Sequence, residues 1–164
     1  MSRADADRWA ADSVIKDDTY HVTPGVANER SIKATGFNFD TIKFGRMWGN
    51  GVYVGTSEET AEIYKRWTGQ SARKLTIRVN VKNPAIHIDS GRYSDNDNIA
   101  DVLSDVLKME RKAAAKLYND YNKDVSRMLT ERGFDSLILR GLSVMGGGDQ
   151  MVIFDPKRVV VIND

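Results

Sequence analysis

The chain has 164 residues, 41% of them hydrophobic and 29% charged, which is the length and composition of one soluble globular domain. Its formal net charge of +1, from 24 basic and 23 acidic side chains, gives no global basic field that would attract nucleic acid or an anionic membrane. The sequence has no cysteine, which excludes disulfides, thiolate metal sites and cysteine nucleophiles. It has no apolar run of roughly 18 residues and no apolar core in its charged N-terminus, so we expect neither a membrane span nor a signal peptide.

The first predicted elements are a short helix, a short strand and a second helix. Residues 4–16 favour a helix, and Trp9 is the side chain that we expect to anchor it. Residues 20–23 have the composition of a strand, which Pro24 closes. A helix is predicted over 26–36, because Pro24 suits the first turn of a helix and the glycine at the end of this range suits its termination.

A turn, a strand and a third helix come next. The dipeptide Asn50-Gly51 has the residues that adopt positive φ in tight turns, so we expect the chain to turn there and then to form a strand. Thr56 and Glu59 have the spacing of a capping box, which places the start of a helix over 58–67.

The following stretch alternates as a half-buried strand does. In residues 74–81 every second side chain is apolar, which favours a strand with one face toward the core. The inward positions of this prediction are Leu75, Ile77, Val79 and Val81. Residues 85–89, after Pro84, can extend the same sheet.

Residues 96–130 carry the longest helical period of the chain. Apolar residues recur there at the spacing of one helix face, which predicts an amphipathic helical insert. A break near Asn119–Asn122 divides the insert into two helices, and Gly133 ends the second.

Three further strands are predicted at 136–140, 150–155 and 158–162. The helices stand among the strands without regular strand–helix alternation, and no linker divides the chain. The sequence therefore predicts a single mixed α+β domain over 1–164 rather than a doubly wound parallel sheet.

Common catalytic and cofactor motifs do not fit this chain. Gly49, Gly51 and Gly55 miss the G-x-G-x-x-G spacing, and they precede a strand instead of joining a strand to a helix. The sequence has neither a Walker A lysine pattern nor a G-x-S-x-G nucleophile motif. His21 and His87 are too few for a three-ligand zinc site unless carboxylates help, and we predict no metal.

Four groups of polar or aromatic residues lie near predicted strand ends or turns, and each has a structural explanation when taken alone. They are residues 20–23, 51–53, 61–64 and 149–150. The last group is the least ordinary, because Asp149 and Gln150 follow three glycines at the mouth of an otherwise apolar strand. The pair either ends a hairpin or belongs to a site.

In their order, these groups resemble the motifs of the ADP-ribosyltransferase family. The chain reads YHVTPG, a helix, GF, GNGVYVGTS, ETAEIY, and a glycine-rich loop before QMVIFDP. It is most similar to the branch with a histidine, a tyrosine and a third residue, and within it to small bacterial and phage members. The resemblance covers 20–67 and 133–160. It implies an ADP-ribosyltransferase-like split β-sheet core with flanking helices, into which the helices of 96–130 are inserted.

The resemblance implies NAD+ as the donor and a role for each matching residue. His21 would hydrogen-bond the ribose, and Thr23 would support the same end of NAD+. Gly51 would let the chain pass close to the nicotinamide. Tyr53 and Tyr64 would lie on either side of the nicotinamide ring, where aromatic faces attract a flat cation.

The third residue departs from the pattern of the family. Gln150 stands where many relatives have a glutamate, and it can bond a ribose hydroxyl but cannot supply full charge or take a proton. Asp149 can do both, yet neighbours on a strand point to opposite faces unless the glycine-rich loop places Asp149 off the strand. The candidate catalytic residues are therefore His21, Tyr53, Asp149 and Gln150, and the carboxylate is either Asp149 or missing.

These residues predict a mono-ADP-ribosyltransferase that modifies a macromolecule, as a bacterial or phage effector. NAD+ has a cationic leaving group, so a site contributes geometry and negative potential rather than acid catalysis. A protein of a host or competitor is favoured over nucleic acid as the acceptor, and we expect a cytoplasmic monomer without membrane contact. The loops at 38–50 and 141–148 are expected to select the acceptor. The alternatives are a degenerate protein of the same fold that acts by binding, and an NAD+ glycohydrolase.

Overall fold

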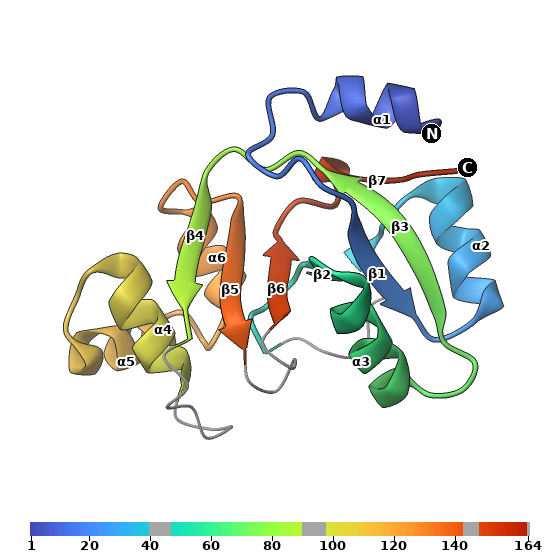
Figure 1. Ribbon diagram of the computed structural model, residues 1–164. Helices are drawn as coiled ribbons and strands as arrows, with labels where there is room; N and C mark the ends of the chain where they lie inside the picture. The colour runs from blue at the N-terminus through green and yellow to red at the C-terminus, as the bar shows by residue number, and fades with distance from the viewer. Residues whose placement is uncertain (40–46, 90–97, 143–147, 164) are drawn as a thin grey trace.

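The structure is a computed structural model that describes residues 1–39, 47–89, 98–142 and 148–163. In these ranges it is a mixed α+β fold, with six α-helices around an open, mostly antiparallel sheet of seven strands (Figure 1). The helices are α1 Arg3–Trp9, α2 Val26–Thr35, α3 Glu58–Thr68, α4 Asn98–Leu107, α5 Arg111–Asp120, α6 Val125–Thr130 and the 3-10 helix η3 Pro156–Arg158. The strands are β1 Thr19–Thr23, β2 Val52–Gly55, β3 Arg73–Val79, β4 Pro84–Ile88, β5 Ser136–Leu142, β6 Gly148–Ile153 and β7 Val159–Val161. The predicted α+β class is confirmed.

The sheet has the order β4-β5-β6-β2-β1-β3-β7, and its neighbouring strands are antiparallel except β4 and β5. β1 pairs with β3 along its whole length, from Thr19 to Thr23. On its other side β1 meets β2 at one pair of facing residues, Tyr20 and Gly55, while β2 pairs more fully with β6. The contact of β1 with β2, called the junction below, is therefore a narrow link between two well-paired parts of the sheet.

Two hydrophobic cores lie on opposite faces of the sheet. Successive strand residues point to opposite faces, so β2 sends Val54 into one core and Tyr53 toward the other. The core that Tyr53 contacts also contains Val152 of β6 and is covered by α4, α5 and α6. The core that contains Val54 is joined by Ile32 of α2 and by Phe37.

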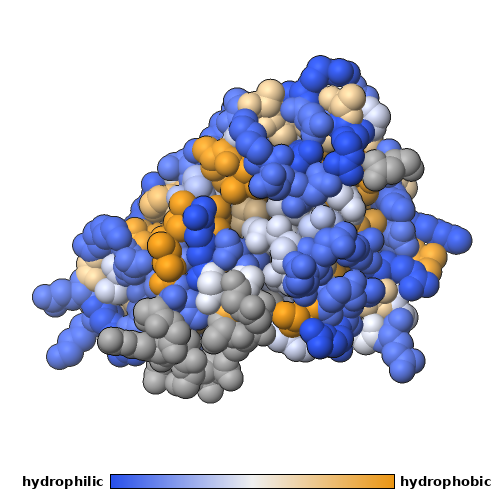
Figure 2. All heavy atoms as spheres, viewed as in Figure 1, coloured by the Kyte–Doolittle hydropathy of each residue, from blue (hydrophilic) through white to orange (hydrophobic). Residues whose placement is uncertain are grey.

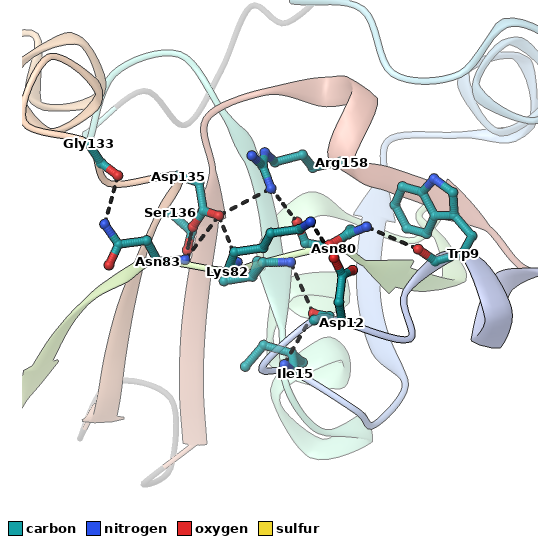
Figure 3. A network of polar contacts seen from close by, with 12 residues as sticks. Trp9, Asp12, Ile15, Asn80, Lys82, Asn83, Gly133, Asp135, Ser136 and Arg158 are labelled. Carbon is teal, nitrogen blue, oxygen red and sulfur yellow. Dashed lines mark hydrogen bonds and ion pairs between the residues drawn. The ribbon is translucent and has the colours of Figure 1, made fainter.

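The N-terminal helix is shorter than predicted, and its fully buried residue is Ala6, not the expected anchor Trp9. α1 ends at Trp9, which is half-buried, whereas Ala6 on the same helix is fully buried. Polar contacts hold the segment instead. The side-chain amide of Asn80 donates to the carbonyl oxygen of Trp9 over 3.0 Å, and Lys82 pairs with Asp12 (Figure 3).

Asp135, which precedes β5, is the centre of the same polar network. Its Oδ2 accepts hydrogen bonds from the backbone N–H groups of Lys82 (2.7 Å) and Asn83 (3.1 Å) and pairs with Arg158 at 3.2 Å (Figure 3). Its Oδ1 accepts from the hydroxyl of Ser136 over 3.1 Å. One carboxylate thus ties the turn between β3 and β4 to β5 and to η3.

The turn before β2 differs from the prediction. The positive φ lies at Gly49 (86°), and not at Asn50 or Gly51. Gly51 is required for a different reason, because a Cβ atom there would lie 2.4 Å from Cγ1 of Val152. The glycine therefore serves the close packing of β2 on β6.

The predicted capping box of the third helix is also wrong by one residue. The cap is Ser57, whose Oγ accepts from the backbone N–H of Thr60 over 3.2 Å. Thr56 donates its backbone N–H to the carbonyl oxygen of Asp149 instead, over 3.3 Å. Gly55 lets α3 lie close on β2, since a Cβ there would meet Cγ2 of Thr60 at 2.9 Å.

The insert predicted over 96–130 forms three helices, one more than expected, and its first two residues lie outside the described ranges. The break between α5 and α6, where Asn122 has a φ of 55°, agrees with the prediction. The break between α4 and α5, where Lys108 has a φ of 53°, was missed. Apolar residues on both sides of it, Leu107 and Met109, pack against the same core, so the helical period continues across the break.

The other predicted elements are confirmed, with ends displaced by one or two residues. α2 ends at Gly36, whose φ is 78°. Large apolar side chains are exposed at several places on the described surface, and Figure 2 shows apolar patches among hydrophilic residues on one face. These side chains include Val14, Val26, Met47, Trp67, Ile86 and Ile88. Within the described ranges, no helix has the length and apolar character to cross a membrane.

Candidate functional site

Four residues with predicted roles come from four elements that converge at the junction. His21 lies on β1, Tyr53 on β2, Tyr64 on α3 and Gln150 on β6. Gly55 of β2 faces Gln150 across one pairing and β1 across the other, and α3 lies over it. The short, glycine-ended β2 therefore brings together side chains that are far apart in the sequence.

His21 spans the gap between β1 and β2. Its Nδ1 lies 2.9 Å from the carbonyl oxygen of Tyr53. A carbonyl oxygen only accepts, so Nδ1 carries the hydrogen and Nε2 of the neutral ring is an acceptor. Phe37 packs edge-on against the imidazole, with ring centroids 4.9 Å apart and planes at 88°. The hydrogen bond and the ring contact together hold the imidazole in place.

The His21 ring is neutral at pH 7. Burial lowers the pKa of the imidazole below its ordinary value, because a charged ring would lose solvation. The hydrogen bond to the carbonyl of Tyr53 opposes this shift only in part. The resemblance led us to expect a hydrogen bond from His21 to a ribose; in this arrangement His21 would accept that bond through Nε2.

The hydroxyl group of Tyr53 is hydrogen-bonded to the backbone of the turn before β2. Its Oη accepts from the backbone N–H of Trp48 over 3.0 Å and donates to the carbonyl oxygen of Gly49 over 3.1 Å. The phenol thereby holds the turn before β2. Trp48, a residue of the predicted acceptor loop, is 4% exposed and belongs to the core, so it packs onto its own domain. Arg46 in the same loop lies outside the described residues.

Tyr64 and Gln150 form a hydrogen-bonded pair. The side-chain amide Nε2 of Gln150 donates to the hydroxyl oxygen of Tyr64. Burial raises the pKa of the Tyr64 phenol well above its ordinary value; the bond from Gln150 lowers it, and the nearby Tyr53 phenol raises it further. Trp67, 60% exposed, packs edge-on against Tyr64 at 5.8 Å.

Asp149 points away from this pair. Its Oδ1 accepts from the backbone N–H of Gly141 over 2.9 Å, at the end of β5. Gln150 therefore contacts Tyr64 on α3, whereas the Asp149 carboxylate contacts the backbone of the neighbouring strand β5. The possibility that the loop curls Asp149 back toward Tyr64 is not realised in this arrangement. The glycine-rich loop itself, at 143–147, lies outside the described residues.

The other two residues with predicted roles are not open at the junction. Thr23, at the far end of β1, is 2% exposed and faces Arg73 of β3, so it presents little surface to a ligand. Gly51 packs against Val152 at the start of β2, as described above.

The described residues also line a cavity of about 300 Å³, but it lies elsewhere. It is formed beside α6 and the turn before β2, and its lining residues are Phe39, Asn50, Asp124, Ser126, Arg127, Thr130, Glu131 and Phe154. None of them has a predicted role in binding NAD+, although Phe39 and Asn50 belong to the predicted acceptor loop at 38–50. The junction and this cavity are therefore separate features.

No group of three possible metal ligands occurs within the described ranges. The two histidines lie on β1 and β4, with three strands of the sheet between them, and His87 is hydrogen-bonded to Asp105 at 2.9 Å. His21 and His87 therefore cannot bind the same ion.

The junction offers neutral hydrogen-bonding groups beside two phenol rings. In the described part of the chain, Nε2 of His21 and Oε1 of Gln150 have no hydrogen-bond partner. Both atoms accept, and the Tyr64 hydroxyl, which accepts from Gln150, keeps its own proton to donate. His21 pairs with Leu75 and packs on Phe37, on the face of the core that contains Val54, whereas Gln150 lies on the face of Tyr53. A ligand that uses both acceptors would therefore have to lie across the narrow link between β1 and β2.

Sequence reasoning missed Phe37 as a contact of His21. The available signal was an aromatic residue directly after Gly36, because a residue that follows a helix-ending glycine often packs back on the domain. The Asp149–Gly141 bond gave no such signal, since it depends on the register of β5 and β6.

We compared the chain with family models, with curated proteins and with solved structures. It matches none of them.

Proposed function

We propose that the chain binds NAD+ at the junction and transfers ADP-ribose from it to a macromolecule, with a protein favoured over nucleic acid as the acceptor. One observation carries the proposal. The elements that meet at the junction carry four residues for which the resemblance to ADP-ribosyltransferases implies roles, hydrogen-bonded as two pairs: the His21 ring with the Tyr53 carbonyl, and Gln150 with the Tyr64 hydroxyl. The narrow pairing of β1 with β2 further supports it, because the expected core is a split sheet.

The groups at the junction suit NAD+. Its nicotinamide is a flat cation, and two neighbouring phenol rings could each contribute about 1–2 kcal/mol of cation–π attraction. The ribose carries hydroxyl groups, which could donate to Nε2 of His21 and to Oε1 of Gln150. NAD+ supplies the reactive bond, between the ribose and a leaving group that departs without a proton.

The protein's part in the reaction is therefore positioning. His21 and Gln150 would fix the ribose while Tyr53 and Tyr64 hold the ring, which reduces the entropy lost on reaching the reactive geometry. Acceptance of two ribose hydrogen bonds by neutral atoms also places partial negative charge near the bond that breaks.

One observation favours a second candidate, a degenerate member of the same fold that acts by binding alone. Asp149 is bonded to the backbone of Gly141, so among the described residues no carboxylate has been found facing Tyr64 or His21. Such a protein would act through its surface and not through the junction. NAD+ hydrolysis, with water as the acceptor, is the third candidate.

The test uses NAD+ labelled in the adenosine part, the purified chain and a cell lysate. Label on a macromolecule together with nicotinamide release supports transfer, whereas nicotinamide release without labelling supports hydrolysis. Both signals should fall in His21→Ala and Tyr64→Phe. Tyr118→Phe, a change in a half-buried tyrosine on α5, outside the junction, is the matched control and should keep them. A chain that neither binds nor consumes NAD+ would contradict the proposal and favour the binding module.

A further inference from the structure

We infer that Asp149 is a positioning residue, whose carboxylate serves as a hydrogen-bond acceptor and fixes the Gln150–Tyr64 contact. The inference rests on the proposed function of the junction and deepens it, because it assigns the ribose contact to Gln150. Asp149 then acts as a hydrogen-bond acceptor, a role that does not require a charged side chain.

The side chain of Asp149 braces β6 against β5. Gly141, whose backbone N–H donates to Oδ1 of Asp149 over 2.9 Å, has a φ of 69°. It lies where the pairing of β5 with β6 shifts register, between Leu139 and Leu142. Such a shift leaves backbone groups without a ladder partner. Asp149 supplies the missing acceptor, and an amide oxygen could do the same.

The main chain of Asp149 braces β6 against α3. Its carbonyl oxygen accepts from the backbone N–H of Thr56 over 3.3 Å and from the Thr56 hydroxyl over 3.4 Å. Thr56 directly precedes Ser57, the cap of α3. The start of the helix that carries Tyr64 is therefore tied to the residue next to Gln150.

These two braces determine where Gln150 points. The bond from Gly141 to Asp149 holds the start of β6 to β5, and so fixes the backbone from which Gln150 reaches the Tyr64 hydroxyl. The bonds from Thr56 also fix the start of α3, the helix that carries Tyr64. A rotation at the start of β6 would separate the amide of Gln150 from the Tyr64 hydroxyl, and both braces oppose that rotation.

The two roles of Asp149 predict different results for Asp149→Asn and Asp149→Ala. Asparagine keeps an oxygen for the N–H of Gly141 and loses the charge; alanine loses both. We expect Asp149→Asn to keep kcat/KM for NAD+ within about threefold, and Asp149→Ala to lower it at least about tenfold, the effect of losing one well-placed hydrogen bond. Equal losses in both variants would overturn the inference and make the charge essential.

A second measurement separates positioning from general damage to the fold. If Asp149 acts through Gln150, Asp149→Ala should cost less than about threefold in a Gln150→Ala background, because the contact it positions is already gone. Independent, multiplying losses in the double variant would overturn the inference. Circular dichroism and urea unfolding of each variant ensure that folded protein is compared.

The positioning role of Asp149 can also be tested without NAD+. If the wild-type chain does not consume NAD+, the ring signals of Tyr64 in NMR spectra of the ligand-free protein still report the brace. They should move in Asp149→Ala and stay in place in Asp149→Asn. Unmoved signals in Asp149→Ala would overturn the inference, whatever the protein does with NAD+.

Discussion

The network around Asp135 and the junction around His21 are both polar clusters, but among the described residues they differ in how many of their hydrogen-bonding atoms have no partner. In the network, the Asp135 carboxylate accepts from the backbone of Lys82 and from Ser136 and pairs with Arg158, so both oxygens are engaged. At the junction, within the described residues, Nε2 of His21 and Oε1 of Gln150 remain without partners. A fully satisfied polar cluster stabilises a fold, whereas unused acceptors beside aromatic rings are what a ligand requires. Changes in the first region should therefore lower stability, and changes in the second should lower ligand binding.

The largest effect on stability is expected from Asp135→Ala. The side chain is 10% exposed, and its removal leaves two backbone N–H groups without their acceptor and breaks the ion pair with Arg158. We expect a loss of about 3 kcal/mol in the free energy of unfolding, measured by urea denaturation. NAD+ affinity per folded molecule should not change. Asp12→Ala, which breaks only the exposed pair with Lys82, is the control and should unfold at the same urea concentration as the wild type. If Asp135→Ala lowered NAD+ affinity without lowering stability, the distinction between a structural network and a ligand site would be wrong.

Gly49→Ala should lower both stability and NAD+ affinity, because the turn before β2 packs on the fold and also holds the Tyr53 hydroxyl. Gly49 has a φ of 86°, and an added Cβ would lie 2.5 Å from Oγ of Ser126. Backbone strain and this clash together should cost about 2 kcal/mol in the free energy of unfolding. The carbonyl of Gly49 accepts the hydroxyl of Tyr53, so NAD+ affinity should fall as well.

Gly36→Ala is the matched control for this prediction. Its φ of 78° gives similar backbone strain, but a Cβ there meets nothing within 4 Å. We expect a loss of about 1 kcal/mol in the free energy of unfolding, from strain alone, and no change in NAD+ affinity. Equal losses in the two variants would show that the contact with Ser126 does not matter.

The sequence predicted most elements because their signals are local. Alternation gave β3 and the apolar run gave β5, and a glycine gave the end of α2 at residue 36. Sequence-based prediction failed where a residue is required by a contact with another strand. Gly51 is explained by Val152, and no pattern near Gly51 indicates that contact.

The same limit applies to the candidate site. The order of motifs was enough to single out His21, Tyr53, Tyr64 and Gln150 as a group. The choice between Asp149 and Gln150 depends on the backbone N–H of Gly141, a group that every residue except proline carries. Main-chain partners leave no trace in side-chain patterns, so this choice needed the register of β5 and β6.

A smaller effect on stability is expected from the pH dependence of His21. Its pKa in the folded protein lies below the unfolded value of about 6.5, so the unfolded chain binds the proton more readily. This difference contributes stability that is present above about pH 6.5 and is lost as the pH falls toward the folded-state pKa. The stability of the wild type relative to His21→Gln should therefore decrease as the pH falls from about 7 to about 5. Urea unfolding at each pH measures it, and a difference that stays constant would contradict the burial of a neutral ring.

The smallest effect on stability, with a clear effect on function, is expected from Tyr64→Phe. The change keeps the aromatic ring and its edge contact with Trp67, and it removes only the oxygen to which Gln150 donates. Gln150 is half-buried and can turn its amide to water, so the free energy of unfolding should fall by less than about 1 kcal/mol. With the amide free to rotate, Oε1 would no longer be held toward the ribose, and kcat/KM for NAD+ should fall about tenfold. If Tyr64→Phe instead lowered stability as much as Asp135→Ala and left NAD+ turnover intact, the junction would be a second structural network. Spare acceptors would then not distinguish a site from a scaffold in this protein.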